Sequence, residues 1–306
     1  MPGLLTHYLA GQRLKSCLKE ESQKILETNE KLYTLGAQGP DIFFYYFPGL
    51  MYKQTHGLGT LMHNSDLGMF ILDMANQCRR SKNEAVFAYT CGYVMHYALD
   101  STAHPYVYGR TTTEGASNIK NGADHRDFET SIDILMLGRL LDKKPNDLVH
   151  FELISAPKTD LQAAAHAASS AIATVYGRAI SRSQAYSAMR FMLHFTKFLQ
   201  SKKGRRKKTL HFFEKITIGE PLFSSMMHNQ ETSPGPLNLD KLEWKAPWDG
   251  ATTENSSFVE LFDKSISAAT EIGRILYDFV FGSADESALA NILGNKSLKT
   301  GMEKTP

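Results

Sequence analysis

Apolar side chains recur every three to four positions along most of this chain, with polar side chains between them. Near the N-terminus Leu14, Leu18, Ile25 and Leu32 form one such stripe opposite many lysines and glutamates. This periodicity predicts amphipathic helices, because one face of an α-helix repeats every 3.6 residues. The predicted helices cover residues 4–33, 57–80, 83–104, 122–137, 160–178, 181–200 and 257–281.

Glycine and proline interrupt the helical pattern at several places. Two glycines and a proline immediately precede Asp41 and place it on a turn. Pro105 predicts a helix end near His104, because the residue before a proline disfavours helical dihedral angles. We also expect a loop over residues 107–121, an irregular excursion over 224–256 and a frayed tail from residue 294. The whole pattern predicts an all-α fold, a multi-helix bundle in which residues 1–306 form a single domain.

Composition adds little to this picture. The chain is 42% hydrophobic and 22% charged, with a formal net charge of +2, which favours no class of charged partner. It has no apolar run of about 18 residues, and its start lacks a basic region followed by an apolar core. Cys17, Cys78 and Cys91 form no close pair, and we interpret them as small buried hydrophobic residues. These features predict a cytoplasmic protein without a leader.

Candidate chemistry begins with the stretch HYALDSTAHP. His96, Asp100 and His104 follow one another at spacings of four, so they share one face of the predicted helix. Imidazole and carboxylate groups arranged in this way can hold a divalent metal. The alternative is a hydrogen-bonded structural pair in the core, and this motif alone does not decide between them. Gly92 lies one turn earlier on the same stripe, which suggests a close approach of another backbone there.

A second pair at the same spacing strengthens the metal interpretation. His125 and Glu129 share a helix face, and His7, Asp41 and His63 lie upstream. Each upstream residue has a structural alternative, since Asp41 can cap the next helix and His63 can be a core histidine. His56 is kept as a spare ligand candidate. The remaining histidines have no carboxylate at helical spacing, and we interpret them as structural. They are His150, His166, His194, His211 and His228.

The ordered set of eight side chains resembles the zinc-dependent phospholipase C family, whose superfamily includes three-zinc nucleases that cut single strands. The family has an early His, an Asp and a later His, then HxxxD with a further His, then HxxxE. This chain supplies them in order as His7, Asp41, His63, His96, Asp100, His104, His125 and Glu129. It departs from the secreted members in spacing, because its central motif reads HxxxDxxxH where theirs reads HxxxDxxxxxH.

The resemblance implies two or three zinc ions in a cleft between the central helices. Asp41 and His63 would join His96 and Asp100 around one zinc. A second zinc would be held by the HxxxE pair together with His104. Asp100 would also reach towards a third zinc held by His7, and the secreted members add a free N-terminal residue there. The family further implies that Asp41 and Asp100 are catalytic, with Asp41 as the base for the attacking water.

The implied function is that of a metal-dependent phosphodiester hydrolase of the phospholipase C type, in which metal-activated water attacks a phosphate ester. Its substrate would be a phospholipid or another phosphodiester, and no specific nucleic acid is expected. One alternative is a single-strand nuclease of the same superfamily. Another is a non-catalytic helical protein whose metals serve only folding.

Two further segments carry candidate contacts. The aromatic run over residues 43–47 is expected to be mostly core, with one or two side chains lining the cleft. A dense basic run follows residue 201 and can be either a solvated turn or a peripheral contact with an anionic membrane. Its members are Lys202, Lys203, Arg205, Arg206, Lys207 and Lys208.

Overall fold

A computed structural model describes residues 3–114, 116–200, 204–229, 231–249 and 252–304. The prediction of an all-α fold is confirmed, since the described residues contain α-helices, short 3-10 helices and two isolated β-bridges. The α-helices are α1 (Leu4–Cys17), α2 (Glu20–Thr28), α3 (Glu30–Gly36), α4 (Leu58–Asn64), α5 (Leu67–Ser81), α6 (Glu84–Thr111), α7 (Asn118–Leu141), α8 (His150–Leu153), α9 (Lys158–Tyr176), α10 (Arg182–Leu199), α11 (Arg205–Thr217), α12 (Phe258–Phe281) and α13 (Glu286–Leu293). The 3-10 helices are η1 (Gly39–Phe43), η2 (Phe47–Met51), η3 (Pro145–Asp147), η4 (Ser224–Met226) and η5 (Gly235–Leu237).

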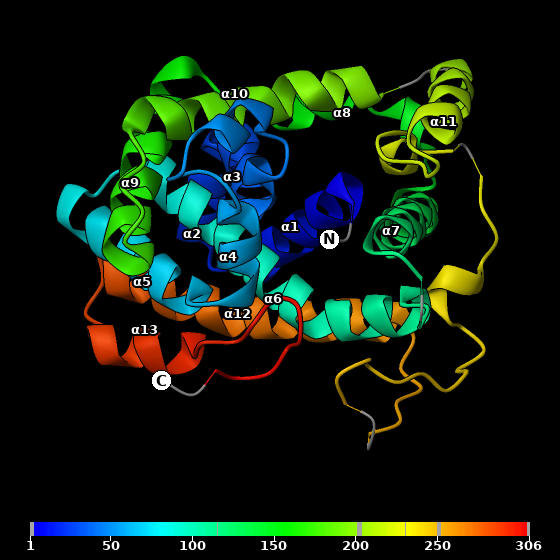
Figure 1. Ribbon diagram of the computed structural model, residues 1–306. Coiled ribbons are helices and arrows are strands. Elements are labelled where there is room, and N and C mark those ends of the chain that lie inside the picture. The colour runs from blue at the N-terminus through cyan, green and yellow to red at the C-terminus, as the bar shows by residue number, and fades with distance from the viewer. Residues whose placement is uncertain (1–2, 115, 201–203, 230, 250–251, 305–306) are drawn as a thin grey trace.

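The buried helix α6 is the centre of the bundle. It packs against α1, α3, α5, α7, α9 and α12 (Figure 1). Its contact with α3 is very close, because a Cβ on Gly92 would lie 2.3 Å from the carbonyl oxygen of Tyr33. Gly92 therefore allows the close approach of another backbone that the sequence suggested. As a result, the end of α3 and the start of η1 lie directly over the middle of α6.

The helix predicted over residues 57–80 is in fact two helices, α4 and α5. Asp66 interrupts them with a φ of 59°, which aspartate tolerates better than most residues. Tertiary contacts fix this break: the Tyr176 hydroxyl donates to the carbonyl of Ser65 at 2.9 Å, and Asn295 donates to the Asp66 carboxylate at 3.0 Å. Such contacts from distant residues leave no trace in the local periodicity.

The prediction that the central helix ends near His104 is wrong. Helix α6 continues through Pro105 to Thr111, so His104 lies within the helix. A proline inside a helix costs about 3 kcal/mol, but Tyr106 and Val107 beyond it are both completely buried. Their packing outweighs the lost hydrogen bond. The predicted loop over 107–121 shrinks accordingly to the residues between α6 and α7.

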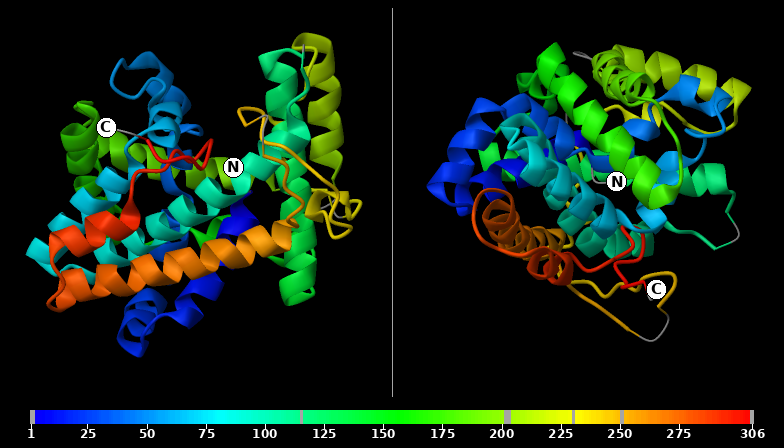
Figure 2. Two further views of the ribbon diagram at one scale, coloured as in Figure 1. Left: turned by 90° about the horizontal axis from the view of Figure 1, so that it is seen from below. Right: turned by 90° about the vertical axis from the view of Figure 1, so that its left-hand side faces the viewer.

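The C-terminal segment is ordered, contrary to the expectation of a frayed tail. Leu298 is fully buried, and its N–H donates to the carbonyl of His63 at 2.9 Å. The hydroxyl of Tyr97 donates to Leu293 O at 2.8 Å and accepts from the N–H of Lys296 at 2.7 Å. A Cβ on Gly301 would meet the carbonyl oxygen of Ser101, so this segment lies against α6 (Figure 2, red).

Four other expectations have mixed outcomes. The long closing helix is confirmed as α12, and the excursion over 224–256 is irregular, with Trp244 buried inside it. Cys17 is exposed, so its interpretation as a buried residue is wrong. Residues 205–208 form the first turn of α11 instead of a solvated turn, while Lys202 and Lys203 lie outside the described residues.

Candidate metal centre

The eight side chains selected from the sequence gather in three groups of potential metal ligands. Within each group, the ligand atoms lie within 4.8 Å of one another. They come from α1, η1, α4, α6 and α7, so segments more than a hundred residues apart in sequence meet here. The groups are His7 with His96 and Asp100; Asp41 with His63 and His96; and His104 with His125 and Glu129. His56 lies in none of them.

Asp100 lies between the first two groups. Its Oδ1 is 3.3 Å from His7 Nε2, and its Oδ2 is 3.1 Å from His96 Nε2. Asp41 Oδ1 lies 3.1 Å from His63 Nε2, which is itself 3.8 Å from Asp100 Oδ2. Donor atoms of a tetrahedral zinc site with bonds of 2.0–2.1 Å stand about 3.3 Å apart. The spacing of these atoms therefore fits donors that surround a common ion.

Several of these atoms are buried without a hydrogen bond. Nε2 of His63, Nε2 of His96 and both carboxylate oxygens of Asp100 have no hydrogen-bond partner among the described residues. Burying unsatisfied polar atoms costs about 1–3 kcal/mol each. Their convergence fits a cation, because a metal ion would satisfy all of them together.

The opposite nitrogen of three imidazoles is fixed by a backbone carbonyl. His63 Nδ1 lies 2.8 Å from Gly59 O, and His96 Nδ1 lies 3.2 Å from Ala37 O. His104 Nδ1 lies 2.8 Å from the carbonyl oxygen of Leu298. A carbonyl can only accept, so each Nδ1 carries the proton and donates it. Each Nε2 consequently presents a lone pair to the site, as a metal ligand requires.

Gly39 allows η1 to pass over the site. Its φ is +53°, and a Cβ there would lie 2.4 Å from the His96 ring. Only glycine fits both conditions at low energy. This close approach places Asp41, two residues later, beside His63. The local turn expected around Asp41 is thus a 3-10 helix whose position depends on this glycine.

Burial favours the neutral form of His63 and His125, while the groups around Asp100 favour its ionised form. Burial lowers the pKa of His63 to about 3 and that of His125 to about 4. Burial alone would raise the pKa of Asp100, but the imidazoles of His104 and His96 hold it well below its usual range. Near neutral pH the site thus offers unprotonated nitrogens and a carboxylate, which are the forms that bind metals.

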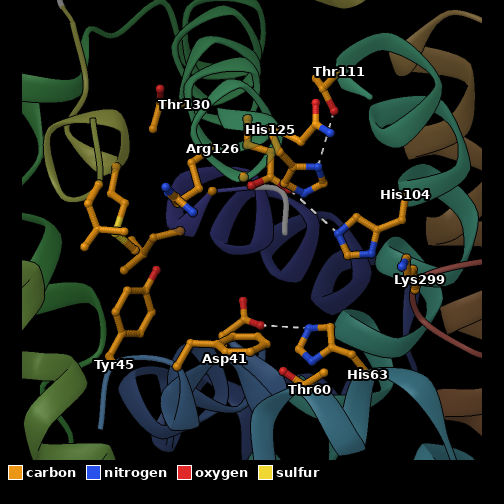
Figure 3. Close-up of a pocket in the computed structure, with 18 of the residues that line it drawn as sticks. Asp41, Tyr45, Thr60, His63, His104, Thr111, His125, Arg126, Thr130 and Lys299 are labelled. Carbon is orange, nitrogen blue, oxygen red and sulfur yellow. Dashed lines mark hydrogen bonds and ion pairs between the residues drawn. The ribbon is translucent and has the colours of Figure 1, made fainter. Parts of the chain in front are cut away.

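The third group lies on the opposite side of a cavity. His125 Nε2 is 2.9 Å from Glu129 Oε1, and His104 Nε2 is 3.7 Å from the same oxygen. Figure 3 shows Asp41 and His63 on one side of the cavity, with His104 and His125 across from them. The cavity has a volume of about 690 Å³, and members of the second and third groups line it.

Part of the lining of this cavity is apolar. Three aromatic residues of the 43–47 run contribute to it, more than the one or two expected: Phe44, Tyr45 and Phe47. Apolar side chains from α10 and from the segment before η4 also line the cavity. They are Met192, Leu199, Leu222 and Phe223.

Sequence reasoning missed several residues that line the cavity or support its walls. Asp133 continues the stripe of His125 and Glu129 by one further turn of α7, so its spacing was a usable signal. It accepts from the N–H of Thr6 at 2.7 Å and pairs with His228 Nε2 at 2.7 Å, which fixes the start of α1 near His7. His228 therefore has a carboxylate partner and lines the cavity, as His150 does. Arg126 and Lys299 also line it, and no spacing pointed to them.

Comparisons with known proteins agree with the site. A family model described as zinc dependent phospholipase C matches residues 6–177, which is more than half of the chain and includes all eight side chains. Searches of curated proteins and of solved structures found no match. None of the helices in the described residues is long and apolar enough to cross a membrane.

Proposed function

This chain belongs to the zinc-dependent phospholipase C family, and from that premise we propose that it hydrolyses phosphodiester bonds of phospholipids. The observation that carries the proposal is the convergence of three potential ligand groups, two of which line one cavity whose lining is partly apolar. The ligand groups would hold the phosphate ester, and the apolar side chains would contact part of an acyl chain.

We assign the first zinc to Asp41, His63, His96 and Asp100. This set joins two neutral imidazoles to two carboxylate oxygens, a donor set suited to zinc. His96 Nε2 belongs to two of the ligand groups, but one nitrogen can bind one ion only. Its distances of 3.1 Å to Asp100 Oδ2 and 3.9 Å to Asp41 Oδ1 support placing it with the first zinc.

The second zinc is assigned to His104, His125 and Glu129. A third would be held by His7 and Asp100, whose Oδ1 lies 3.3 Å from His7 Nε2, so that Asp100 would contribute to two ions. This third position has fewer protein donors, and we therefore keep the number of ions at two or three. The set of His104, His125 and Glu129 has three protein donors and leaves an open position, which is typical of catalytic sites, whereas the first set already has four donors.

Bound zinc would supply Lewis acidity and lower the pKa of water near the phosphate ester. Among the chain's own groups, Asp41 is our candidate for accepting the proton from the attacking water. It lines the cavity, and burial raises its pKa well above the usual range. Asp100 is the other proposed catalytic carboxylate, with a role in holding both ions. The products would be an alcohol and a phosphomonoester.

We further propose that α11 adsorbs to anionic membranes. Arg205, Arg206 and Lys208 are exposed in its first turn, and Phe212 and Ile216 are exposed further along it, at 63% and 67%. A helix with a basic part and exposed apolar side chains suits the headgroup region of a bilayer. Lys207 has a different role, because its amine donates to the carbonyl of Met227 at 2.8 Å.

Two broader expectations also stay proposals. A continuous buried core reaches from Leu5 to Leu298, which supports residues 1–306 as one zinc-dependent phospholipase C-like domain. The cytoplasmic location expected from the sequence stays a prediction.

The direct test is turnover by zinc-loaded and chelated protein. The substrates are a phospholipid, a small soluble phosphodiester and single-stranded DNA, and release of the phosphomonoester is measured. We expect zinc-dependent cleavage of the phospholipid. Cleavage of DNA alone would favour the nuclease, and zinc-loaded protein without any turnover would favour a metal-stabilised structural protein.

A further inference from the structure

The cavity receives positive charge from two walls in addition to its potential metal ligands. Arg126 on α7 lines one wall, and its guanidinium donates to Ser225 Oγ at 2.9 Å and to Pro221 O at 3.4 Å. Lys299 from the C-terminal segment lines the other side (Figure 3). Neither side chain forms an ion pair with a carboxylate of the described residues. Both charges are thus available to a ligand.

The position of Lys299 is fixed by its neighbour. Leu298 is completely buried, and its backbone groups bind the carbonyl of His63 and the ring of His104. Residues 298–300 form a turn, which the Gly301 N–H closes by donating to the carbonyl oxygen of Ser297 at 2.9 Å. Because Leu298 is anchored in the core beside the proposed ligands, the backbone of Lys299 is held at the rim of the cavity, and its exposed side chain lines it.

An aromatic pair near His125 would otherwise suit a quaternary ammonium group. Tyr108 packs against the His125 ring at 4.5 Å between centroids and against Trp248 at 5.4 Å. Aromatic faces attract cations, and such clusters bind choline in many proteins. Here the Lys299 amine already lies 5.4 Å from the centroid of the Tyr108 ring. A ligand cation would meet this amine at the same aromatic face.

The cavity also lacks a carboxylate to attract a ligand cation. Of the described residues that line it, Asp41 and Glu129 are the only carboxylates, and both belong to the ligand groups. The positive charge of even two divalent ions would exceed the negative charge of the three carboxylates in those groups. The net charge of the metal-loaded groups would therefore be positive, and Lys299 and Arg126 would add to it.

We propose that Lys299 selects phospholipids whose head group carries an additional anionic group, and that it disfavours choline and other ammonium head groups. This inference rests on the proposed hydrolysis of phospholipids and names the substrate class of that site. The acidic group on the head group would approach the Lys299 amine above Tyr108, while the scissile phosphate lies at the ligand groups. Arg126 adds positive charge from the opposite wall.

Binding of product-like phosphomonoesters to the zinc-loaded full chain tests this proposal without requiring turnover. Isothermal titration calorimetry compares inositol 1,4-bisphosphate, inositol 1-phosphate and phosphocholine. We expect the wild type to bind the bisphosphate at least about tenfold more tightly than phosphocholine, as one additional charge-assisted contact would give. Lys299→Met should reduce that preference by about tenfold, and Lys299→Glu should reduce it further by attracting the choline ammonium.

Lys296→Met is the matched control, because Lys296 belongs to the same segment but does not line the cavity. It should leave the preference unchanged. The proposal is overturned if the wild type prefers phosphocholine, or if it binds none of the three ligands. It is also overturned if Lys299→Met weakens all three by the same factor, since the lysine would then contact only the phosphate that they share.

Turnover separates this inference from the proposed function. Dihexanoyl phosphatidylinositol 4-phosphate should be cleaved faster than dihexanoyl phosphatidylcholine, and Lys299→Met should narrow the difference. If neither lipid is cleaved while the binding preference persists, the proposed function fails and the anion selectivity stands. Tighter binding of a thymidine oligonucleotide than of the bisphosphate would overturn selection of a lipid head group.

Discussion

Removal of the C-terminal segment should weaken zinc binding without unfolding the bundle. A chain that ends at Lys296 loses Leu298, whose carbonyl accepts from His104 Nδ1 at 2.8 Å and whose N–H donates to His63 O at 2.9 Å. Hydrogen bonds that orient a ligating histidine typically contribute 10–100-fold to metal affinity. We therefore expect the second zinc to bind about 10–100-fold more weakly, which corresponds to about 1.4–2.8 kcal/mol.

The expected loss of folding stability is smaller than these contacts alone suggest. Burial of one leucine contributes about 2–3 kcal/mol and the hydrogen bond to His63 about 1 kcal/mol. The truncated chain no longer has to order the removed residues, which offsets part of this. The net decrease in the free energy of unfolding should stay below about 3 kcal/mol, measured by urea denaturation of the metal-free protein.

Leu298→Ala is the matched control for this truncation. It retains the backbone groups that bind His104 and His63, and it leaves a cavity that costs about 2–5 kcal/mol of stability. Zinc affinity, measured by competition with a chromophoric chelator, should change only a few-fold in this variant. If the truncated chain binds zinc as tightly as the full chain does, the orienting role of the segment is refuted.

Other positions give equally specific expectations. Gly39→Ala should lower the free energy of unfolding by at least about 2 kcal/mol and weaken zinc binding, because its Cβ would collide with the His96 ring. Gly57→Ala is the control, since Gly57 also has a positive φ but has open space around its Cβ position. It should lower the free energy of unfolding by only about 1 kcal/mol and leave zinc affinity intact. Burial lowers the pKa of His150 to about 4, below its unfolded value of 6.5, so the unfolded chain binds the additional proton. The contribution of neutral His150 to the free energy of unfolding is fully present above pH 6.5. It is lost as the pH falls towards 4, by up to about 3 kcal/mol. Denaturation of the metal-free His150→Gln variant should therefore depend less on pH than that of the wild type. Changing Lys202, Lys203 and Lys208 to glutamine should weaken binding to anionic vesicles in a salt-sensitive way, and loss of turnover of a soluble phosphodiester would count against a purely peripheral role.

Sequence alone was sufficient where the relevant signal is local. The spacing of four between His96 and Asp100, and between His125 and Glu129, places each pair on one helix face whatever the tertiary structure is. Helix ends were less predictable, because α6 continues through Pro105 only by virtue of the buried residues beyond it. No sequence pattern pointed to Lys299. Its place at the cavity depends on its neighbour Leu298, which contacts His104 from more than 190 residues away in sequence.

The most direct test of the metal centre is elemental analysis of the wild type, Asp100→Ala and Glu129→Ala. Asp100 offers one oxygen towards His7 and the other towards His96, so its loss removes a donor from each of two ions. Glu129 contributes to the third group alone. We predict two or three zinc ions in the wild type and a greater loss of zinc in Asp100→Ala than in Glu129→Ala. Equal losses would contradict the bridging role, and a wild type that purifies without metal and cannot be loaded with zinc would contradict the whole account.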